Sequence, residues 1–595
     1  MNDDEANRLE QVAELAKRRG FFFPANEPYG GVAGFWTYGP AGGALKRNVE
    51  QRWRDRFVHA EGNMEIQSPT IMPEAVFEAS GHLEDFTDWV IECPSCETSH
   101  RADHLVEDTG EVEDAEGLGA KAIEALIDDL GVVCPVCGTD LTESSVGEFN
   151  LMFKTAIGPG DGNPGYLRPE TAQGMFTDLP RLLEYAREQL PFGVAQIGPA
   201  YRNEISPRRT IIRVREMTQA ELEWFYDPEE DEPSLERIGE VELTLYPVPA
   251  QEGDETESTI TVSEALDDGI IANPWIGYFL GISQRFFIDL GVDPERLRFR
   301  QHLPGELAHY AEDCWDAEAQ VSGDWIELAG FASRADNDLR KHHEKSDDSY
   351  TVFKAYDEPK TFVRASVDPD MSVLGPEFGE AAGDVVDILE DLAQSDPEAF
   401  QSGTSVTIEI DGESHEVPLD VTGFSVDEVT ESGEHILPHV AEPAFGIDRL
   451  VYTLLEHNFE EDVVDGEHRT YLGLSPEVAP TLAGVFPLID ADGLPERAKE
   501  LATDLADAGI AVTYDDSGAI GRRYRRQDEI GTPYCLTIDH QTLEDDTVTL
   551  RDRDTTGQIR IDLDDAIDIL QSLRAGTQSF EQVSSQADPV KREER

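Results

Sequence analysis

The chain has 595 residues, of which 39% are hydrophobic, so several domains with real cores are expected. Asp and Glu number 123 against 47 Lys and Arg, which gives a formal charge of -76. Such a charge would normally exclude affinity for nucleic acid. It also fits a protein adapted to saturating salt, where the Debye length falls to about 3 Å or less. We favour adaptation to salt, because the acidic excess is spread along the whole chain.

No targeting or membrane segment is expected. The start of the chain, 1–5, is acidic with no apolar run after it, which argues against a secretory signal. No apolar stretch approaches the roughly 18 residues of a membrane helix. The six cysteines include two CxxC pairs, a pattern typical of a reduced, cytoplasmic protein.

Residues 8–19 are predicted as a short amphipathic helix, and a Gly-rich stretch runs over 29–40. The next helix has one apolar face, formed by Leu45, Val49, Trp53 and Phe57. Residues 64–69 are predicted as a strand that ends at proline. A long helix running into such a strand suits a dimer element, and ordinary core packing explains the pattern equally well.

Two CPxC knuckles, Cys93 with Cys96 and Cys134 with Cys137, suit a tetrahedral zinc ion held by four thiolates. Their separation exceeds the usual ribbon spacing, and the acidic insert 107–129 between them is expected to be helical. A redox pair, or cysteines without a ligand, is the alternative. We favour a structural zinc ion, since four cysteines would close the site to catalysis.

A Gly- and Pro-rich loop leads to Arg168 and Glu170, which are two residues apart on an extended segment and therefore point to one side. An amphipathic helix follows. Residues 228–270 are acidic and polar and are predicted to be an insertion.

Residues 201–225 are predicted as two antiparallel strands joined by a tight loop at 205–209, where proline removes a backbone donor. Five arginines fall within fourteen residues of this acidic chain: Arg202, Arg208, Arg209, Arg213 and Arg215. Guanidinium groups on a rigid hairpin suit a polyphosphate, because they bind phosphate oxygens bidentately. A surface hairpin laced with salt bridges is the alternative.

Glu327 stands in an apolar strand next to small residues, where a carboxylate is costly to bury unless it is paired or bound to a metal. We predict a ligand of a cation or substrate; a buried ion pair is the alternative. Residues 345–432 are predicted to be an inserted domain of acidic helices and a polar hairpin.

Residues 442–449 are predicted to turn from a strand through glycine into an apolar helix. Arg449 at the start of that helix works against the helix dipole by about 0.3–1 kcal/mol. An anion held by both the helix terminus and Arg449 would remove this penalty.

A break near 460–470 precedes a β-α-β alternation, which predicts a compact α/β domain of about 100 residues. Its basic run includes Arg522, Arg523, Arg525 and Arg526 around an aromatic residue, which suits phosphate contact and stacking with RNA. A solvated helix face is the alternative. The polar tail after about 575 is predicted to be disordered.

Together these stretches resemble class II aminoacyl-tRNA synthetases, and specifically the glycyl-tRNA synthetases of the archaeal and eukaryotic dimeric type. The helix and strand ending in Pro69 resemble motif 1. Tyr201 to Glu204, with Arg213 four residues before Met217, resemble motif 2, and Gly446 to Arg449 resemble motif 3. The resemblance spans about 21–565. It implies an α+β fold, with an antiparallel sheet core flanked by helices, insertions, and a C-terminal α/β anticodon-binding domain.

The expected division of the chain follows from the resemblance. It comprises 1–92 with the dimer element, 93–147 with the zinc knuckles, 148–344 with motif 2 and the glycine site, the acidic insertion 345–432, 433–465 with motif 3, the anticodon-binding domain 470–575, and the polar tail 576–595.

The resemblance also implies a reaction. Glycine and ATP, with Mg²⁺, would give glycyl-adenylate and pyrophosphate, and the glycyl group would move to the 3′ end of tRNA(Gly). The enzyme would be a cytoplasmic homodimer. Two alternatives stay open: another class II synthetase of the threonyl, prolyl or histidyl type, and a non-catalytic RNA-binding protein on the same scaffold.

By resemblance, Arg202 holds the α-phosphate, Glu204 reads the adenine amine, Arg449 holds the γ-phosphate and Glu327 helps to bind magnesium. The other expected ATP contacts are Asn203, Ile212, Arg213, Val214, Arg215, Glu216, Met217, Leu328, Gly446, Ile447 and Asp448. The expected glycine site comprises Arg101, Glu170, Met217, Thr218, Gln219, Ala220, Glu221, Glu442, Pro443, Ala444, Phe445 and Gly446. Two positions depart from the family: Met217 replaces a phenylalanine that stacks on adenine, and Ala444 replaces a serine that would touch glycine.

Overall fold

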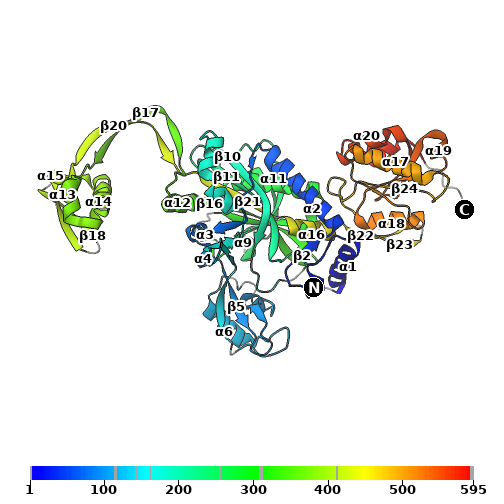
Figure 1. Cartoon of the computed structure of the whole chain (residues 1–595), viewed down its shortest axis with the longest axis horizontal. Helices are drawn as coiled ribbons and strands as arrows, with labels where there is room; N and C mark the ends of the chain where they lie inside the picture. The colour runs from blue at the N-terminus through cyan, green and yellow to red at the C-terminus, as the bar shows by residue number, and fades with distance from the viewer. Residues whose placement is uncertain are drawn as a thin grey trace. The chain divides into compact units, whose positions relative to one another are not determined.

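The computed structural model describes residues 3–110, 112, 115, 117–142, 144–160, 162–207, 210–253, 256–306, 313–401, 403–410, 413–464 and 466–589. The chain forms two compact units, one of Met1–Tyr350 with Pro438–Arg595 and one of Thr351–Leu437 (Figure 1). Among the described residues, no helix is long and apolar enough to cross a membrane.

A nine-stranded, mostly antiparallel sheet organises the larger unit. Its strands are, in spatial order, β13 (Ser258–Thr261), β12 (Glu242–Tyr246), β14 (Leu297–Gln301), β15 (Cys314–Val321), β16 (Asp324–Ala335), β21 (His439–Gly446), β11 (Glu216–Tyr226), β10 (Phe192–Tyr201) and β3 (Met64–Glu65). Because β12 and β13 belong to this sheet, the prediction that 228–270 is an insertion is wrong. Leu243 and Leu245 of β12 are 0% exposed and bury the strand against the core.

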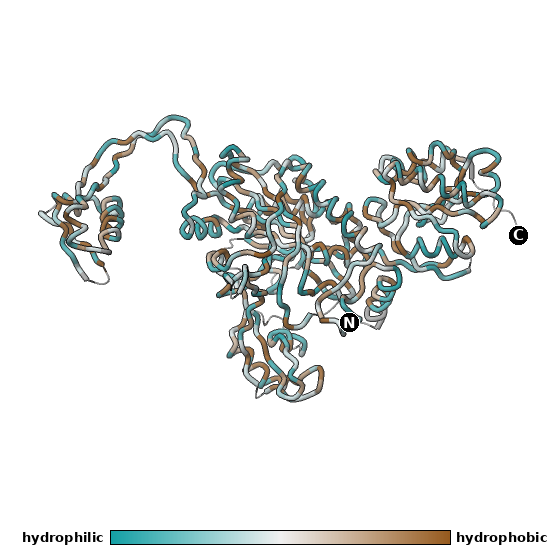
Figure 2. The backbone as a smooth tube through the Cα atoms, viewed as in Figure 1, coloured by the Kyte–Doolittle hydropathy of each residue, from teal (hydrophilic) through white to brown (hydrophobic). Residues whose placement is uncertain are grey.

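Helices with apolar faces cover one side of the sheet. They are α2 (Pro40–Trp53), continued by a π-helical turn η2 (Arg54–His59), α11 (Pro274–Leu290) and α16 (Ile447–His457). The predicted face of Leu45, Val49, Trp53 and Phe57 is 0% exposed in this core, so it is occupied by the chain itself. Figure 2 shows hydrophobic and hydrophilic residues alternating along the chain.

The strand predicted at 64–69 is shorter than expected, because β3 pairs with β10 only through Met64 and Glu65. Further along, the backbone N–H of Ser68 donates to the side chain of Gln196 (3.3 Å), so the chain leaves the sheet before Pro69.

The other side of the sheet carries α7 (Ala172–Thr177) and α12 (Asn337–Lys345). Nearby lie α3 (Glu74–Ser80), α4 (His82–Asp85), α8 (Leu179–Tyr185) and a three-stranded sheet of β4 (Ile71–Pro73), β9 (Asn163–Leu167) and β8 (Phe153–Ile157). The remaining elements of this part are α1 (Asp3–Arg19), β1 (Phe22–Pro24), η1 (Glu27–Tyr29), β2 (Trp36–Tyr38), α9 (Val248–Gln251), α10 (Val262–Asp267) and η3 (Pro294–Arg296).

The loop between β10 and β11 is longer than predicted. Tyr201 pairs with Glu216, so the loop comprises 202–215 instead of 205–209. The guanidinium of Arg215 donates to the backbone oxygens of Glu204 (2.8 Å) and Ala33 (2.9 Å). These bonds stabilise the loop, which lies beyond the paired part of the two strands. Arg208 and Arg209 lie outside the described residues.

The cysteine-bearing insertion consists of a sheet of β6 (Ser99–Arg101), β5 (Thr87–Glu92) and β7 (Val146–Asn150), packed with α5 (Ala102–Glu107) and α6 (Ala120–Leu130). Helix α6 lies where a helical excursion was predicted, and residues 111, 113, 114 and 116 of that insert lie outside the described part.

The smaller unit, Thr351–Leu437, has its own core, which includes Leu374, Val385 and Leu389. It comprises β17 (Val352–Ser366), α13 (Met371–Phe378), η4 (Gly379–Ala381), α14 (Ala382–Ser395), η5 (Pro397–Phe400), β18 (Ser405–Ile410), β19 (Glu413–Pro418), α15 (Leu419–Thr422) and β20 (Ser425–Ile436). Strands β17 and β20 form a long ribbon, and β18 pairs with β19.

The C-terminal part is an α/β domain with a sheet of β25 (Val512–Tyr514), β24 (Ala483–Pro487), β26 (Tyr534–Ile538), β27 (Thr547–Asp552), β28 (Gln558–Asp562) and β29 (Asp588–Pro589). Its helices are α17 (Leu494–Asp507), α18 (Ile520–Ile530), α19 (Thr542–Asp545), η6 (Leu563–Asp565), α20 (Ala566–Arg574) and α21 (Phe580–Ser584).

Two predictions near this domain are wrong. The break at 460–470 is a hairpin of β22 (Phe459–Val464) and β23 (Glu467–Leu472). The tail after 575 is ordered through 589: Ser579 and Gln582 form a capping box that starts α21, and Val583 is buried against the domain core. A short apolar anchor next to a good helix start outweighs the polar composition.

Candidate active site

The motif 2 loop holds its charged side chains through protein partners. The Glu204 carboxylate, 7% exposed, accepts a hydrogen bond from Nε of Arg213 (2.9 Å). The Arg202 guanidinium lies 5.4 Å from the ring centroid of Phe86 and donates to the backbone oxygen of Pro169 (3.3 Å). The backbone N–H of Arg202 donates to the oxygen of Arg215 (3.1 Å), which closes the loop. Arg202, Arg213 and Arg215 are therefore held in place by other parts of the protein.

Arg449, on the first turn of α16, reaches across to β16. Its Nη1 donates to Oε2 of Glu327 (2.9 Å) and to the Glu327 backbone oxygen (2.9 Å), while Nε donates to the oxygen of Ile212 in the motif 2 loop (3.3 Å). The charge of Arg449 lowers the pKa of Glu327, and Arg202 acts in the same direction. Guanidinium groups from motifs 2 and 3 thus act on one carboxylate.

Glu327 is not buried, as the sequence suggested, because 48% of its side chain is exposed. A β-bulge between Ala317 and Glu318 shifts the register of β15 against β16 at this point. The bulge turns Glu327 outward while Leu328 and Ala329 stay in the core. The expected magnesium ligand is therefore accessible to solvent.

Asp316 of β15 was missed by the sequence analysis. Burial raises its pKa to about 6, and the neighbouring charge of Glu327 adds to the effect. His302 stands 2.9 Å from its Oδ2 and opposes that shift. The charge of one carboxylate thus raises the pKa of the other, and such a pair suits a divalent cation; the alternation of β15 around Trp315 was the available signal.

Four glutamates gather around β11 and β21. Oxygens of Glu221, Glu223 and Glu442 lie within 4.8 Å of one another, and all three side chains are buried. Glu221 accepts hydrogen bonds from the backbone N–H (2.8 Å) and hydroxyl (2.5 Å) of Thr171. Burial raises the pKa of Glu221 to about 8, and the charges of Glu442 and Glu170 raise it further. The site is therefore short of positive charge.

Two of these glutamates have basic partners. Arg334 donates to Oε2 of Glu442 (2.6 Å), although burial still raises the pKa of Glu442. Glu170 accepts from Gln173 (3.0 Å) and lies 3.5 Å from Nε2 of His82. Burial would raise the pKa of Glu170, but His82 and Arg334 hold it well below its usual range.

The pleat of β11 and β21 divides the predicted glycine residues between two faces. Glu221 lies opposite Ala444, and Gly330 lies opposite Ala444 on the other side, so small residues line the glutamate face. Ala220 and Phe445 are 0% exposed and belong to the helix-covered core. A contact of the Phe445 ring with glycine is thus excluded, because β21 points it away from the glutamates.

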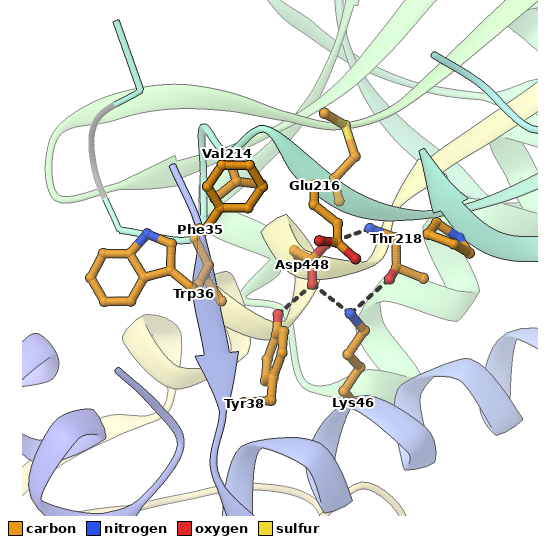
Figure 3. Close-up of a pocket in the computed structure, with 11 residues that line it drawn as sticks. Phe35, Trp36, Tyr38, Lys46, Val214, Glu216, Thr218 and Asp448 are labelled. Carbon is orange, nitrogen blue, oxygen red and sulfur yellow. Dashed lines mark hydrogen bonds and ion pairs between the residues drawn. The ribbon is translucent and has the colours of Figure 1, made fainter. Parts of the chain in front are cut away.

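Asp448 and Thr218 also lie behind this face. Asp448 accepts from the hydroxyl of Tyr38 (2.5 Å), from Nζ of Lys46 (2.8 Å) and from the backbone N–H of Thr218 (2.6 Å). Figure 3 shows these bonds around a cavity of about 120 Å³ that Met217 also lines. The carboxylate ties α16 to β11, β2 and α2, so it supports the site from behind.

Arg101 is held within the cysteine-bearing insertion, where it pairs with Asp103 and lies 3.2 Å from Oδ2 of Asp88. Arg213 of motif 2 contacts His104 of the same insertion (3.3 Å). The insertion therefore packs against the motif 2 loop.

The four cysteines of the knuckles meet in one cluster. Sγ of Cys93 lies 3.5 Å from Sγ of Cys137, Cys96 lies 3.7 Å from Cys134, and all four sulfurs fall within 4.8 Å of one another. Zinc with Zn–S bonds of about 2.3 Å sets tetrahedral sulfurs about 3.8 Å apart, so the donor set fits that ion. Nε2 of His100 lies 3.4 Å from Sγ of Cys134.

The basic helix α18 does not present all of its arginines. Arg523 is 2% exposed and donates to the backbone oxygens of Asp516 (2.8 Å), Gly518 (2.7 Å) and Pro487. The prediction that Arg523 binds RNA is therefore wrong, because its guanidinium caps backbone carbonyls inside the domain. Arg522 is exposed, Arg525 is 28% exposed, and Arg526 is partly exposed and bonded to Asp515.

Comparisons with known proteins bear on this arrangement. The family model described as "tRNA synthetase class II core domain (G, H, P, S and T)" matches residues 160–253, and that described as "Anticodon binding domain" matches 483–573. The chain is 49% identical over 589 residues to the glycine–tRNA ligase of Methanothrix thermoacetophila, a match that covers 98% of this chain and 100% of the relative. The chain belongs to the glycine–tRNA ligase family.

Further relatives carry the same name. The glycine–tRNA ligase of Archaeoglobus fulgidus is 46% identical, covering 95% of this chain and 97% of the relative. The glycine–tRNA ligase of Methanocaldococcus jannaschii is 44% identical, covering 95% and 99%. The predicted fold class, a class II synthetase core with a C-terminal anticodon-binding domain, is confirmed for this member of the glycine–tRNA ligase family.

Proposed function

We propose that this chain activates glycine with ATP and transfers it to the 3′ end of tRNA(Gly). The observation that carries the proposal is one face of the sheet. On four neighbouring strands of this face, the residues that lie opposite one another are Asp316, Gly330, Ala444 and Glu221. At one end, Arg449 and the nearby Arg202 act on Glu327, and at the other the sheet presents Glu221 and Glu442 with Glu170 nearby. Arginines suit a triphosphate, and carboxylates suit an ammonium group.

In the first step, a carboxylate oxygen of glycine attacks the α-phosphorus, and the bond to the β-phosphate oxygen breaks with its electron pair leaving on pyrophosphate. Arg202 and Arg449 would stabilise charge on the phosphates, and Glu204 would accept from the adenine amine. The protein supplies position and electrostatic stabilisation. In the second step, a hydroxyl of the terminal ribose attacks the carbonyl carbon, the bond from that carbon to the phosphate oxygen breaks, and AMP leaves while its phosphate takes up the hydroxyl proton.

Magnesium would be held by Glu327 with Asp316, the two carboxylates beside Arg449. When bound, Mg²⁺ screens the phosphate charges and orients the leaving pyrophosphate. Because the glutamate face is lined by Ala444 and Gly330, we propose that the wall behind glycine excludes the methyl group of alanine. One methyl group is normally worth only about 1–3 kcal/mol, so the wall has to be rigid.

Further parts of the prediction stay proposals. Arg522, Arg525 and Arg526 would contact tRNA, and the enzyme would be a cytoplasmic homodimer adapted to high salt. Since the apolar face of α2 is used within the chain, the partner would bind a different surface of motif 1.

The experiment that tests the activity is pyrophosphate exchange in high salt with each of the twenty amino acids. We expect exchange that depends on glycine alone. Exchange with no amino acid would favour the non-catalytic scaffold, and fastest exchange with threonine, proline or histidine would favour one of the other synthetase types.

We also propose a structural zinc ion at Cys93, Cys96, Cys134 and Cys137. Metal analysis of the purified protein should find about one zinc per chain, and Cys134→Ser should remove it. Because Arg213 contacts His104 of the same insertion, we expect zinc loss to raise the KM for ATP several-fold, about 1 kcal/mol. Retention of zinc by the serine variant would contradict this site.

A further inference from the structure

Among the four clustered glutamates, Glu223 is the one for which neither carboxylate oxygen has a hydrogen-bond partner among the described residues. Its side chain is 0% exposed, so it is shielded from bulk solvent. A buried carboxylate without donors is costly in its charged form. Glu223 is not part of the predicted glycine site, and its exceptional environment calls for an explanation.

The pairing of β11 with β21 places Glu223 among like charges. Glu221 lies opposite Ala444 and Trp224 opposite Ala441, which sets Glu223 opposite Glu442. Oxygens of Glu221, Glu223 and Glu442 are within 4.8 Å of one another. Three charges at this separation inside a protein repel strongly, so the cluster requires a proton or a cation.

The donors around the cluster indicate which carboxyl keeps a proton. Thr171 gives two hydrogen bonds to Glu221, and Arg334 gives one to Glu442 while it also binds Asp338 (2.9 Å). Donors stabilise the ionised form of the carboxylate they contact. Glu223 receives none, although the charges of Glu442, Glu221, Arg334 and Asp338 all act on it.

We propose that Glu223 is a neutral carboxylic acid whose proton lies toward Glu442, and that it acts as a positioning residue behind the glycine ammonium site. Glu221 and Glu442 then carry the charge that the ammonium group needs, and the Glu223 hydroxyl fixes the orientation of Glu442. Burial, followed by the charge of Glu442, raises the pKa of Glu223 well above its usual range, in agreement with this assignment. The role in glycine binding rests on the proposed function, and the protonation does not.

The first test measures thermal unfolding at fixed high salt from pH 5 to pH 9 for the wild type and Glu223→Gln. A carboxyl whose pKa is higher in the folded state favours folding below the pKa of the unfolded chain, and this stabilisation is lost as pH rises toward the folded pKa. Glutamine does not titrate. The melting temperature of Glu223→Gln should therefore rise progressively relative to wild type across this range.

The control is Glu456→Gln, another buried glutamate, which pairs with Arg8 and Arg296. We expect this variant to melt below wild type at pH 6 and at pH 8, since both arginines lose their charged partner and are left with backbone oxygens and an amide as acceptors. A constant difference between Glu223→Gln and wild type from pH 5 to pH 9 would overturn the protonation. This test needs no catalysis, so its outcome is independent of the proposed function.

The second test compares the KM for glycine in pyrophosphate exchange. Glutamine retains a donor at the position of the carboxyl hydroxyl, so Glu223→Gln should keep the KM for glycine within about threefold of wild type. Glu223→Ala lacks this donor and should raise the KM about tenfold, with a smaller change in kcat. Glu221→Gln should raise the KM about 100-fold. If Glu223→Gln raised the KM as much as Glu221→Gln, Glu223 would be an ionised ligand of the ammonium and the proposal would fail.

A bound cation is the remaining explanation of the cluster. Addition of Mg²⁺ or Ca²⁺ to metal-free protein without nucleotide distinguishes it. We expect the same change in melting temperature for wild type and Glu223→Gln. A metal-dependent rise that disappears in Glu223→Gln would assign the site to a metal ion and overturn the proposal.

Discussion

Two regions of the nine-stranded sheet use a glutamate in opposite ways. Glu327 is 48% exposed, pairs with Arg449 and keeps a lowered pKa. Glu223, two strands away in the same sheet, is 0% exposed, has no donor among the described residues and has a raised pKa. The difference shows that burial and donors, more than residue type, set the charge of each glutamate.

The largest effect should come from the arginines of the phosphate end. Arg202→Ala should lower the rate of glycine-dependent pyrophosphate exchange by about 10³-fold or more, because a preorganised positive charge next to the transferring phosphoryl group is lost. The melting temperature should change little, because the Arg202 side chain makes a weak bond to Pro169.

The matched control is Arg54→Ala, which removes a partly exposed arginine that pairs with Glu65, a residue outside the predicted site. It should leave the exchange rate unchanged. A nearly normal rate in Arg202→Ala would remove that residue from the mechanism.

The KM for glycine should depend on pH in the range where Glu221 titrates. Because burial raises the pKa of Glu221 to about 8, the ionised fraction of this carboxyl grows as pH rises from 6 to 8, and the ionised form binds the ammonium group. The KM for glycine should fall as pH rises from 6 to 8, by up to about tenfold per pH unit. Glu221→Gln should abolish this dependence, and a wild-type KM that is flat across the range would contradict it.

A contrast between a buried and an exposed charged residue can also be tested in the C-terminal domain. Variants there should have the smallest effect on catalysis. Arg523→Ala should destabilise the protein by about 2–4 kcal/mol, since three backbone oxygens lose their donor. Arg525→Ala should leave stability intact and raise the KM for tRNA about fivefold, while pyrophosphate exchange stays normal. Urea unfolding and aminoacylation assays separate the two variants, and equal stability loss in both would contradict the difference in burial.

Sequence patterns predicted much of the architecture. The four-residue spacing from Leu45 to Phe57 identified a buried helix face, and the order of strands and helices after 480 matched the C-terminal domain closely. The pleat of β11 could also have identified Glu223, because it lies two residues from Glu221 on the same face.

Other features depend on tertiary contacts that no local pattern encodes. The exposure of Glu327 follows from a bulge between β15 and β16, which requires both strands to be paired. The burial of Arg523 follows from carbonyl groups at Asp516, Gly518 and Pro487, which the chain brings together only after folding. Salt-bridge partners fix the long motif 2 loop in the same way.

The pair formed by Arg449 and Glu327 has a consequence for how the reaction begins. In the ligand-free protein, Arg449 and Glu327 neutralise each other. A nucleotide without a metal would bind Arg449 and leave Glu327 next to unscreened phosphate charges. A metal without a nucleotide would bind Glu327 and leave the charge of Arg449 without its partner. Only a preformed complex of both satisfies the two side chains at once, and nucleotide and metal should therefore enter together as a single unit.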